Sequence, residues 1–126
     1  MTTLPEGFHH LHLELARESG HPDGDSHHGY DIVAPLTLDG HLDPVAWRAD
    51  PHLCHVRRFR PDRDDAVGKL ARRPGGQWYI DYGPGSADDE AGFRFNDERF
   101  VPGEYVSIRE DDGEFHAFKV ALVRPL

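Results

Sequence analysis

The sequence contains a single cysteine, Cys54, so no disulfide can form within the chain. Chains without disulfides are typical of reducing compartments. Residues Met1–Glu6 lack the basic start and the apolar run of a signal peptide. No window approaches the ~18 consecutive apolar residues that a membrane-spanning helix needs. These absences predict a soluble, cytoplasmic protein.

Segments without glycine or proline are short. Thirteen glycines and ten prolines interrupt the 126 residues, and the longest stretch without either is Phe8–Ser19. Because an interior proline or glycine destabilises a helix by roughly 3 or 1 kcal/mol, long helices have little room. A chain of this length fits one domain, residues 1–126, which can fold without a structural metal ion.

Apolar residues recur at every second position in several segments, which is the period of a β-strand. The clearest runs lie within residues 30–38, 78–82, 106–108 and 115–123, with glycine-rich turns between them. Both alternating sets are apolar in residues 115–123, which predicts a strand buried on both faces. We therefore predict a mainly β fold, a small single-domain barrel or rolled antiparallel sheet of about seven short strands with one short helix.

Two local elements have clear boundaries in the sequence. Asp112-Gly113 is a turn signal between Tyr105–Arg109 and Phe115–Val123, which predicts a terminal β-hairpin. The short helix is expected to begin after Asp43, an N-cap residue that is followed directly by proline, and to end before Pro51.

The segment Phe8–Ser19 fits two interpretations. Leu11, Leu13 and Leu15 alternate as in a strand. Phe8, Leu11 and Leu15 also fit one stripe of a helix. We favour the strand.

Positive charge is scarce, because the net charge is -9. This balance argues against a nucleic-acid-binding protein. The exception is the segment Arg48–Arg73, which contains eight basic and only four acidic residues. Such asymmetry predicts either an electrostatic partner or pairing with acidic segments of the same chain.

Histidine is abundant, with ten residues. Near the N-terminus, two histidines and a glutamate occur at every second position, which is the spacing of side chains on one face of a strand. If Phe8–Ala16 is a strand, His10, His12 and Glu14 project from one face. Two imidazoles and a carboxylate can ligate a divalent metal such as Zn, Mn or Fe. The His-x-His pair resembles the start of the cupin metal motif, which implies a metal site, although cupins place their glutamate further along. The alternative is a polar, solvent-facing strand face.

Two further clusters are candidates. Cys54 lies between His52 and His55, a setting for a reactive thiolate or a metal ligand, although a lone cysteine between apolar neighbours is more often a small core residue. Arg58 and Arg60 would share one strand face and could bind an anion such as phosphate or a carboxylate. The alternative is pairing with the acidic segments at residues 88–90 and 110–112.

No phosphate-binding loop, dinucleotide motif, nucleophile elbow or paired Cys-x-x-Cys is present. We therefore predict a non-catalytic β domain that binds an unknown protein or small-molecule ligand, without a cofactor, and that could form a homodimer. Aromatic residues are the expected contacts: Trp47, Trp78, Tyr79 and Tyr82. The alternative is a metal-binding protein or small metalloenzyme that uses the His10, His12 and Glu14 face.

Overall fold

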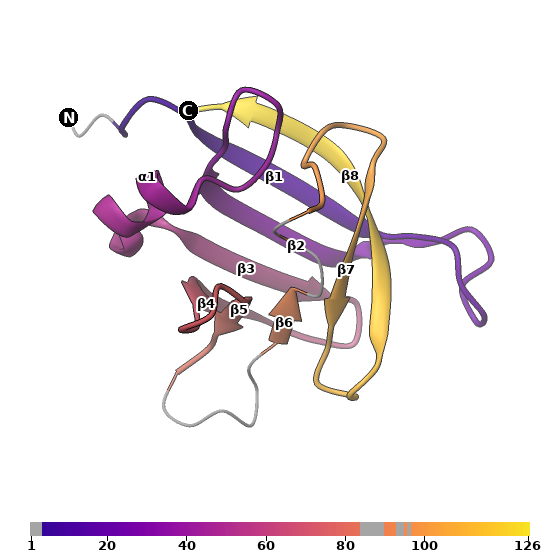
Figure 1. Ribbon diagram of the computed structural model, residues 1–126. Helices are drawn as coiled ribbons and strands as arrows, with labels where there is room; N and C mark the ends of the chain where they lie inside the picture. Colours follow the sequence, from indigo (N-terminus) through magenta and orange to yellow (C-terminus); the bar gives the residue numbers. More distant parts are fainter. Residues whose placement is uncertain (1–3, 84–89, 93–94, 96) are drawn as a thin grey trace.

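The computed structural model describes residues 4–83, 90–92, 95 and 97–126, and within these residues the chain forms a β-barrel (Figure 1). Each strand pairs antiparallel with the next, and the last pairs with the first, which closes the barrel. The strands are β1 Phe8–Leu15, β2 Asp25–Pro35, β3 His55–Arg60, β4 Arg63–Arg72, β5 Trp78–Asp81, β6 Glu90–Gly92, β7 Tyr105–Arg109 and β8 Phe115–Pro125. The prediction of a mainly β barrel is confirmed.

The segment after Phe8 is a strand and not a helix. In β1, Leu11, Leu13 and Leu15 are buried and point into the barrel, whereas the residues between them are only partly buried. This alternation continues around the barrel, because successive side chains of a strand point to opposite faces. The interior of one half of the barrel is therefore a continuous apolar core with the largest side chains from Trp78, Tyr30, Phe8, Phe95, Phe100 and Phe118.

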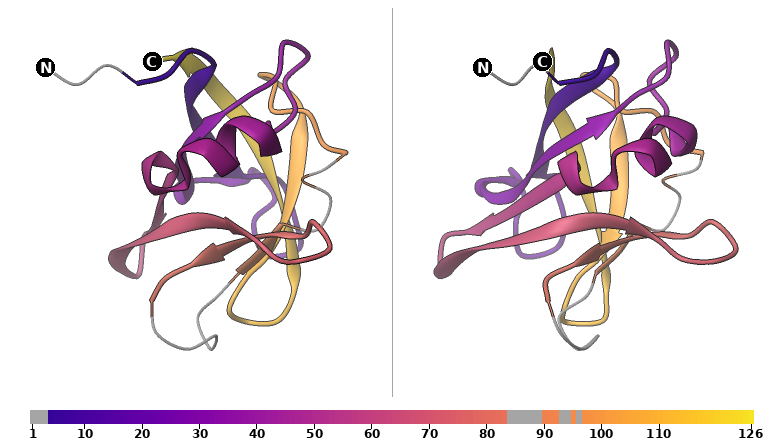
Figure 2. Two further views of the ribbon diagram at one scale, coloured as in Figure 1. Left: turned by 60° about the vertical axis from the view of Figure 1, so that its left-hand side comes forward. Right: turned by 90° about the vertical axis from the view of Figure 1, so that its left-hand side faces the viewer.

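A short helix covers one end of the barrel (Figure 2). Helix α1 spans Pro44–Ala49, and Asp43 caps it by accepting the backbone N–H groups of Val45 and Ala46, as predicted. A 3-10 helix, Pro51–Leu53, follows and leads into β3. Trp47 packs edge-on against Trp78 and donates its indole N–H to the carbonyl of Leu70. No helix in the described part of the chain is long and apolar enough to cross a membrane.

The terminal hairpin of β7 and β8 is confirmed, although β8 continues to Pro125, two residues beyond the predicted end at Val123. Strand β8 is not buried on both faces, so that part of the prediction is wrong. Phe118 and Val120 are fully buried, whereas Phe115 is 50% exposed. A bulge lies between the pairs His12 with Leu122 and Leu13 with Val120, so β8 contains one extra residue there. The extra residue reverses the alternation, and Leu122 is consequently exposed. Of the second apolar set of β8, Phe115, Ala117 and Ala121 are exposed, whereas Val123, beyond the bulge, packs against the core.

Candidate functional site

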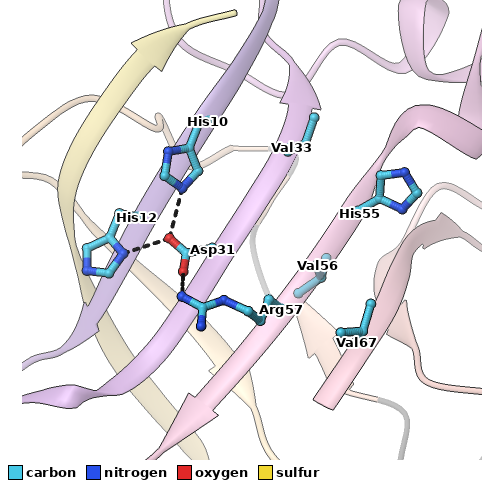
Figure 3. Close-up of a pocket in the computed structure, with 8 residues that line it drawn as sticks. All are labelled: His10, His12, Asp31, Val33, His55, Val56, Arg57 and Val67. Atoms are coloured by element: carbon cyan, nitrogen blue, oxygen red, sulfur yellow. Dashed lines mark hydrogen bonds and ion pairs between the residues drawn. The ribbon is translucent and has the colours of Figure 1, made fainter. Parts of the chain in front are cut away.

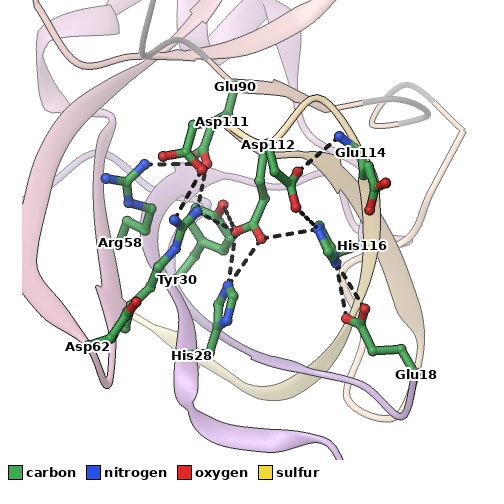
Figure 4. Close-up of polar contacts among 12 residues, drawn as sticks. Glu18, His28, Tyr30, Arg58, Asp62, Glu90, Asp111, Asp112, Glu114 and His116 are labelled. Carbon is green, nitrogen blue, oxygen red and sulfur yellow. Dashed lines mark hydrogen bonds and ion pairs between the residues drawn. The ribbon is translucent and has the colours of Figure 1, made fainter. Parts of the chain in front are cut away.

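The barrel interior changes from apolar to polar at the end opposite α1, and Figure 4 shows the polar contacts at that end. Helix α1 lies before the start of β3, whereas Arg58 and Arg60 lie towards its end. The inward-facing positions of the other strands carry polar groups at the same level. We call this group the polar end; its residues are His28, Tyr30, Arg58, Arg60, Tyr82, Glu90 and Glu110.

Two buried carboxylates organise the polar end. The side chains of Glu90 and Glu110 are 0% and 3% exposed, and Nη2 of Arg60 lies 3.3 Å from one and 3.0 Å from the other. Tyr82 donates its hydroxyl to Glu90 at 2.5 Å, and Tyr30 donates to Glu110 at 2.6 Å. Each carboxylate therefore forms an ion pair with Arg60 and accepts a hydrogen bond from a tyrosine hydroxyl. These interactions offset part of the free-energy cost of removing the carboxylate charge from water.

The pKa values of the two carboxyl groups are shifted in opposite directions. Burial raises the pKa of Glu90 above its ordinary value, and the hydrogen bond from Tyr82 and the charge of Arg58 oppose this only in part. Burial alone would also raise the pKa of Glu110, but hydrogen bonds from His28 and Tyr30 and the charge of Arg60 lower it. Glu110 is thus the more firmly ionised of the pair.

The predicted anion-binding residues, Arg58 and Arg60, both belong to the polar end. Arg58 and Arg60 share the inward face of β3, and their partners are carboxylates of the same chain, as the pairing alternative anticipated. Arg60 also forms an ion pair with Asp111, with Nη1 of Arg60 3.1 Å from Oδ1 of Asp111. An external anion would have to displace these carboxylates. The Nε atoms of both arginines are buried without a hydrogen-bond partner among the described residues.

Another cluster of ionisable side chains lies at the rim of the polar end, in and beside the turn between β7 and β8 (Figure 4). His116 contacts Glu18 through Nδ1 at 3.0 Å and Asp112 through Nε2 at 2.8 Å. Burial alone would lower the pKa of His116, but the hydrogen bonds to Asp112 and Glu18 raise it above the ordinary value. Within the described residues, Asp112, Glu114 and His116 are the single trio of potential metal ligands whose donor atoms all lie within 4.8 Å of one another.

The predicted metal residues His10, His12 and Glu14 do share the outer face of β1. Figure 3 shows two of them, His10 and His12. Nε2 of His10 and Nδ1 of His12 lie 2.8 and 2.7 Å from the same oxygen, Oδ1 of Asp31. The other nitrogen of His12 lies 3.0 Å from Glu14. The trio does not bring its donor atoms within 4.8 Å of one another, and metal binding there stays a prediction.

Asp31 is a residue of this outer face that the sequence analysis did not identify as a candidate. It lies on β2 directly opposite His12 on β1 and Arg57 on β3, and Arg57 donates to its second oxygen. Burial alone would raise the pKa of Asp31, but hydrogen bonds from His12, Arg57 and His10 lower it. An alternating polar and apolar strand was visible at residues 30–38, yet the partners of Asp31 depend on strand register.

An open groove runs across the outer face from β1 to β5. Its first hollow, about 490 Å³, is lined by residues of β1 to β4 and appears in Figure 3. A second hollow of about 290 Å³ includes Lys69 and shares His55 and Val67 with the first. We call the two together the outer groove. Val67 is 69% exposed, and the described residues provide no polar partner for the side chains of His55 and Lys69.

The Cys54 cluster does not form a reactive site in the fold. Cys54 is fully buried, and its thiol donates weakly to the carbonyl of Asp50 at 3.8 Å. Burial, together with the nearby charge of Asp50, raises the pKa of the thiol to about 12. Of the four aromatics expected to contact a partner, Trp78 is a core residue, and Trp47 and Tyr82 pack against the core.

Comparisons of the chain with protein-family models, with curated proteins and with solved structures found no match. Its function is therefore inferred from the geometry of the sites described above.

Proposed function

We propose that this protein is a non-catalytic binding domain and that its ligand site is the outer groove. The observation that carries the proposal is the arrangement around Val67. His55 on β3 and Lys69 on β4 are directly opposite in the strand register, both point outwards, and neither has a polar partner in the described chain. Small-molecule sites are concave and combine an apolar lining with a few polar groups, and the outer groove has this composition.

The chemistry of the groove favours a carboxylate on an apolar body. Lys69 offers an ammonium group and His55 an imidazole, which suit a carboxylate. Val67 and Val33 offer the apolar contact. Both basic residues belong to the segment Arg48–Arg73, whose excess positive charge stands out from the acidic remainder of the chain. Arg57 contributes less, because Asp31 and Asp65 already pair with it.

The test is an NMR titration of ¹⁵N-labelled protein with hexanoate and with its neutral analogue hexanamide. Hexanoate should shift the amide signals of His55, Val67 and Lys69, and hexanamide should bind several-fold more weakly. The chain has two lysines, which provides a matched pair of variants. Lys69→Gln should weaken hexanoate binding, whereas Lys119→Gln on the outer face of β8 should leave it unchanged. Equal binding of acid and amide would contradict the proposal.

The metal-binding alternative at His10, His12 and Glu14 remains a prediction, and the convergence of His10 and His12 on Asp31 is the observation that favours it. A metal ion there would require neutral imidazoles and would replace the hydrogen bonds to Asp31. The proposal also includes a cytoplasmic location, which the buried, unpaired thiol of Cys54 supports.

A further inference from the structure

The hairpin turn between β7 and β8 and the first residues of β8 bring together three metal-ligating side chains from five consecutive residues. Asp112, Glu114 and His116 occur at alternate positions, and their donor atoms lie within 4.8 Å of one another. A bound divalent ion would need these atoms about 2 Å from itself, which small side-chain rotations can achieve. Glu114 is exposed, so its carboxylate has space to rotate.

Glu18 holds His116 in the orientation that a metal ligand needs. It comes from the segment between β1 and β2, and its two carboxylate oxygens lie 3.0 and 3.2 Å from Nδ1 of His116. Metal-ligating histidines commonly donate one ring N–H to a carboxylate, which fixes the tautomer and leaves the other nitrogen for the ion. That other nitrogen, Nε2, faces Asp112 at 2.8 Å.

Carboxylates outnumber arginine and lysine partners on the side of the turn that carries His116. Glu110 is 3% exposed, and its Oε1 lies 3.7 Å from Nε2 of His116, too far for a hydrogen bond. Arg60 pairs with Glu110 at 3.0 Å and, together with Arg63, contacts Asp111. No arginine or lysine of the described chain pairs with Glu18, Asp112 or Glu114. The side of the turn that carries His116 therefore has an excess of negative charge, which attracts a cation.

We propose that Asp112, Glu114 and His116 bind a divalent transition-metal ion, with Glu18 as the hydrogen-bond acceptor that orients His116. One imidazole and two carboxylates suit zinc, manganese or iron(II) better than magnesium or calcium, which prefer oxygen ligands alone. The ion would tie the β7–β8 hairpin, through Glu18, to the segment that joins β1 and β2. This site is separate from the outer groove and from the His10 and His12 face.

The experiment uses the full, untagged chain at pH 7.5, with zinc, manganese and magnesium chloride as probes. Calorimetry should show one equivalent of zinc or manganese bound and weak or no magnesium binding. Substoichiometric Mn²⁺ should broaden the amide signals of residues 112–116 in ¹⁵N spectra. Glu114→Gln should weaken zinc binding at least tenfold, and the matched change Glu104→Gln, at another exposed glutamate, should leave it unchanged.

A second pair of variants separates this site from the outer face. His116→Gln should abolish the Mn²⁺ broadening at the turn, whereas the double change His10→Ala with His12→Ala should preserve it. Loss of binding in the double variant together with full binding in Glu114→Gln would overturn the proposal in favour of the β1 face. Absence of saturable binding of any of the ions would also overturn it, and would leave His116 as an imidazolium that bridges Glu18 and Asp112. Neither result affects the carboxylate titration of the outer groove.

Discussion

At the scale of single residues, Cys54 shows how burial determines reactivity. A thiol flanked in sequence by His52 and His55 could be a nucleophile, but only the thiolate reacts. In the fold the side chain is fully buried and its pKa is raised to about 12, so the thiolate is scarce at neutral pH.

We therefore expect Cys54 to resist alkylation by iodoacetamide in native protein at pH 8 and to react at the rate of an ordinary thiol in urea. Mass spectrometry over time measures both rates. Because the chain has a single cysteine, the modified fraction reports on this site alone. Rapid labelling without denaturant would show that the thiol is accessible and activated.

Gly29 is a residue whose role comes from close packing of the backbone. It lies in β2 next to the β1 irregularity between Glu14 and Leu15. A Cβ atom at this position would lie 1.9 Å from the carbonyl oxygen of Leu13 and 2.9 Å from the Phe59 ring. Any side chain there would force two adjacent strands apart.

Gly29→Ala should therefore destabilise the protein by about 3 kcal/mol or more, since overpacking of this kind requires backbone movement. The comparison is Gly20→Ala, where nothing lies within 4 Å and only a positive φ of 92° opposes a side chain. That change should cost about 1 kcal/mol. Urea unfolding measures both, and equal losses would mean that β1 and β2 are less closely packed than described.

At the scale of elements, the hairpin of β3 and β4 is joined to the β7–β8 turn by ion pairs of very different burial. Arg60 and Arg63 hold the two oxygens of Asp111 at 3.1 and 3.0 Å. The side chain of Arg60 is 7% exposed and also contacts Glu90 and Glu110, whereas that of Arg63 is 45% exposed. The two arginines thus form a natural comparison of a buried and a surface pair.

Arg60→Met should destabilise the protein by about 3 to 5 kcal/mol, because it leaves buried carboxylates without their cation. Arg63→Met should cost less than about 1 kcal/mol, because exposed ion pairs contribute little. Chemical denaturation at pH 7 and 0.15 M salt measures the difference. Similar losses for both variants would mean that the polar end is hydrated and not buried.

At the scale of the whole molecule, the ionisable groups predict how stability depends on pH. The pKa values of Asp31, Glu110, Asp111 and Asp112 are lowered in the fold. Each of these groups binds a proton more readily in the unfolded chain, so each contributes stability above its unfolded pKa of about 4 that is lost as the pH falls. Glu90 acts in the opposite direction, because its pKa is raised.

The free energy of unfolding should accordingly decrease from pH 6 to pH 3, most steeply below about pH 4.5. Asp31→Asn should lower the stability at pH 7, and the gap to the parent protein should narrow as the pH falls towards 3. Guanidinium denaturation at four pH values measures both curves. A constant gap across this range would mean that the pKa of Asp31 is the same in the folded and unfolded states.

The sequence by itself determined the local elements of this protein. Alternation placed β1, β5, β7, β8 and the second half of β2, whereas it did not place β3, β4 or β6. Asp43 placed the start of α1, and Asp112-Gly113 placed the terminal hairpin, because each cause lies within a few residues of its effect. It also determined that His10, His12 and Glu14 share a face, since strand geometry alone decides that.

Only the tertiary structure decided which charged groups meet. Glu18 and His116 are 98 residues apart, and Arg60 and Glu110 are 50 apart. Arg58 and Arg60 were expected on one face, but that the face points into the closed barrel followed from its closure. A carboxylate has no periodic signature, and its partner depends on the register of neighbouring strands and on the bulge in β8. Those are properties of the sheet and not of any single strand.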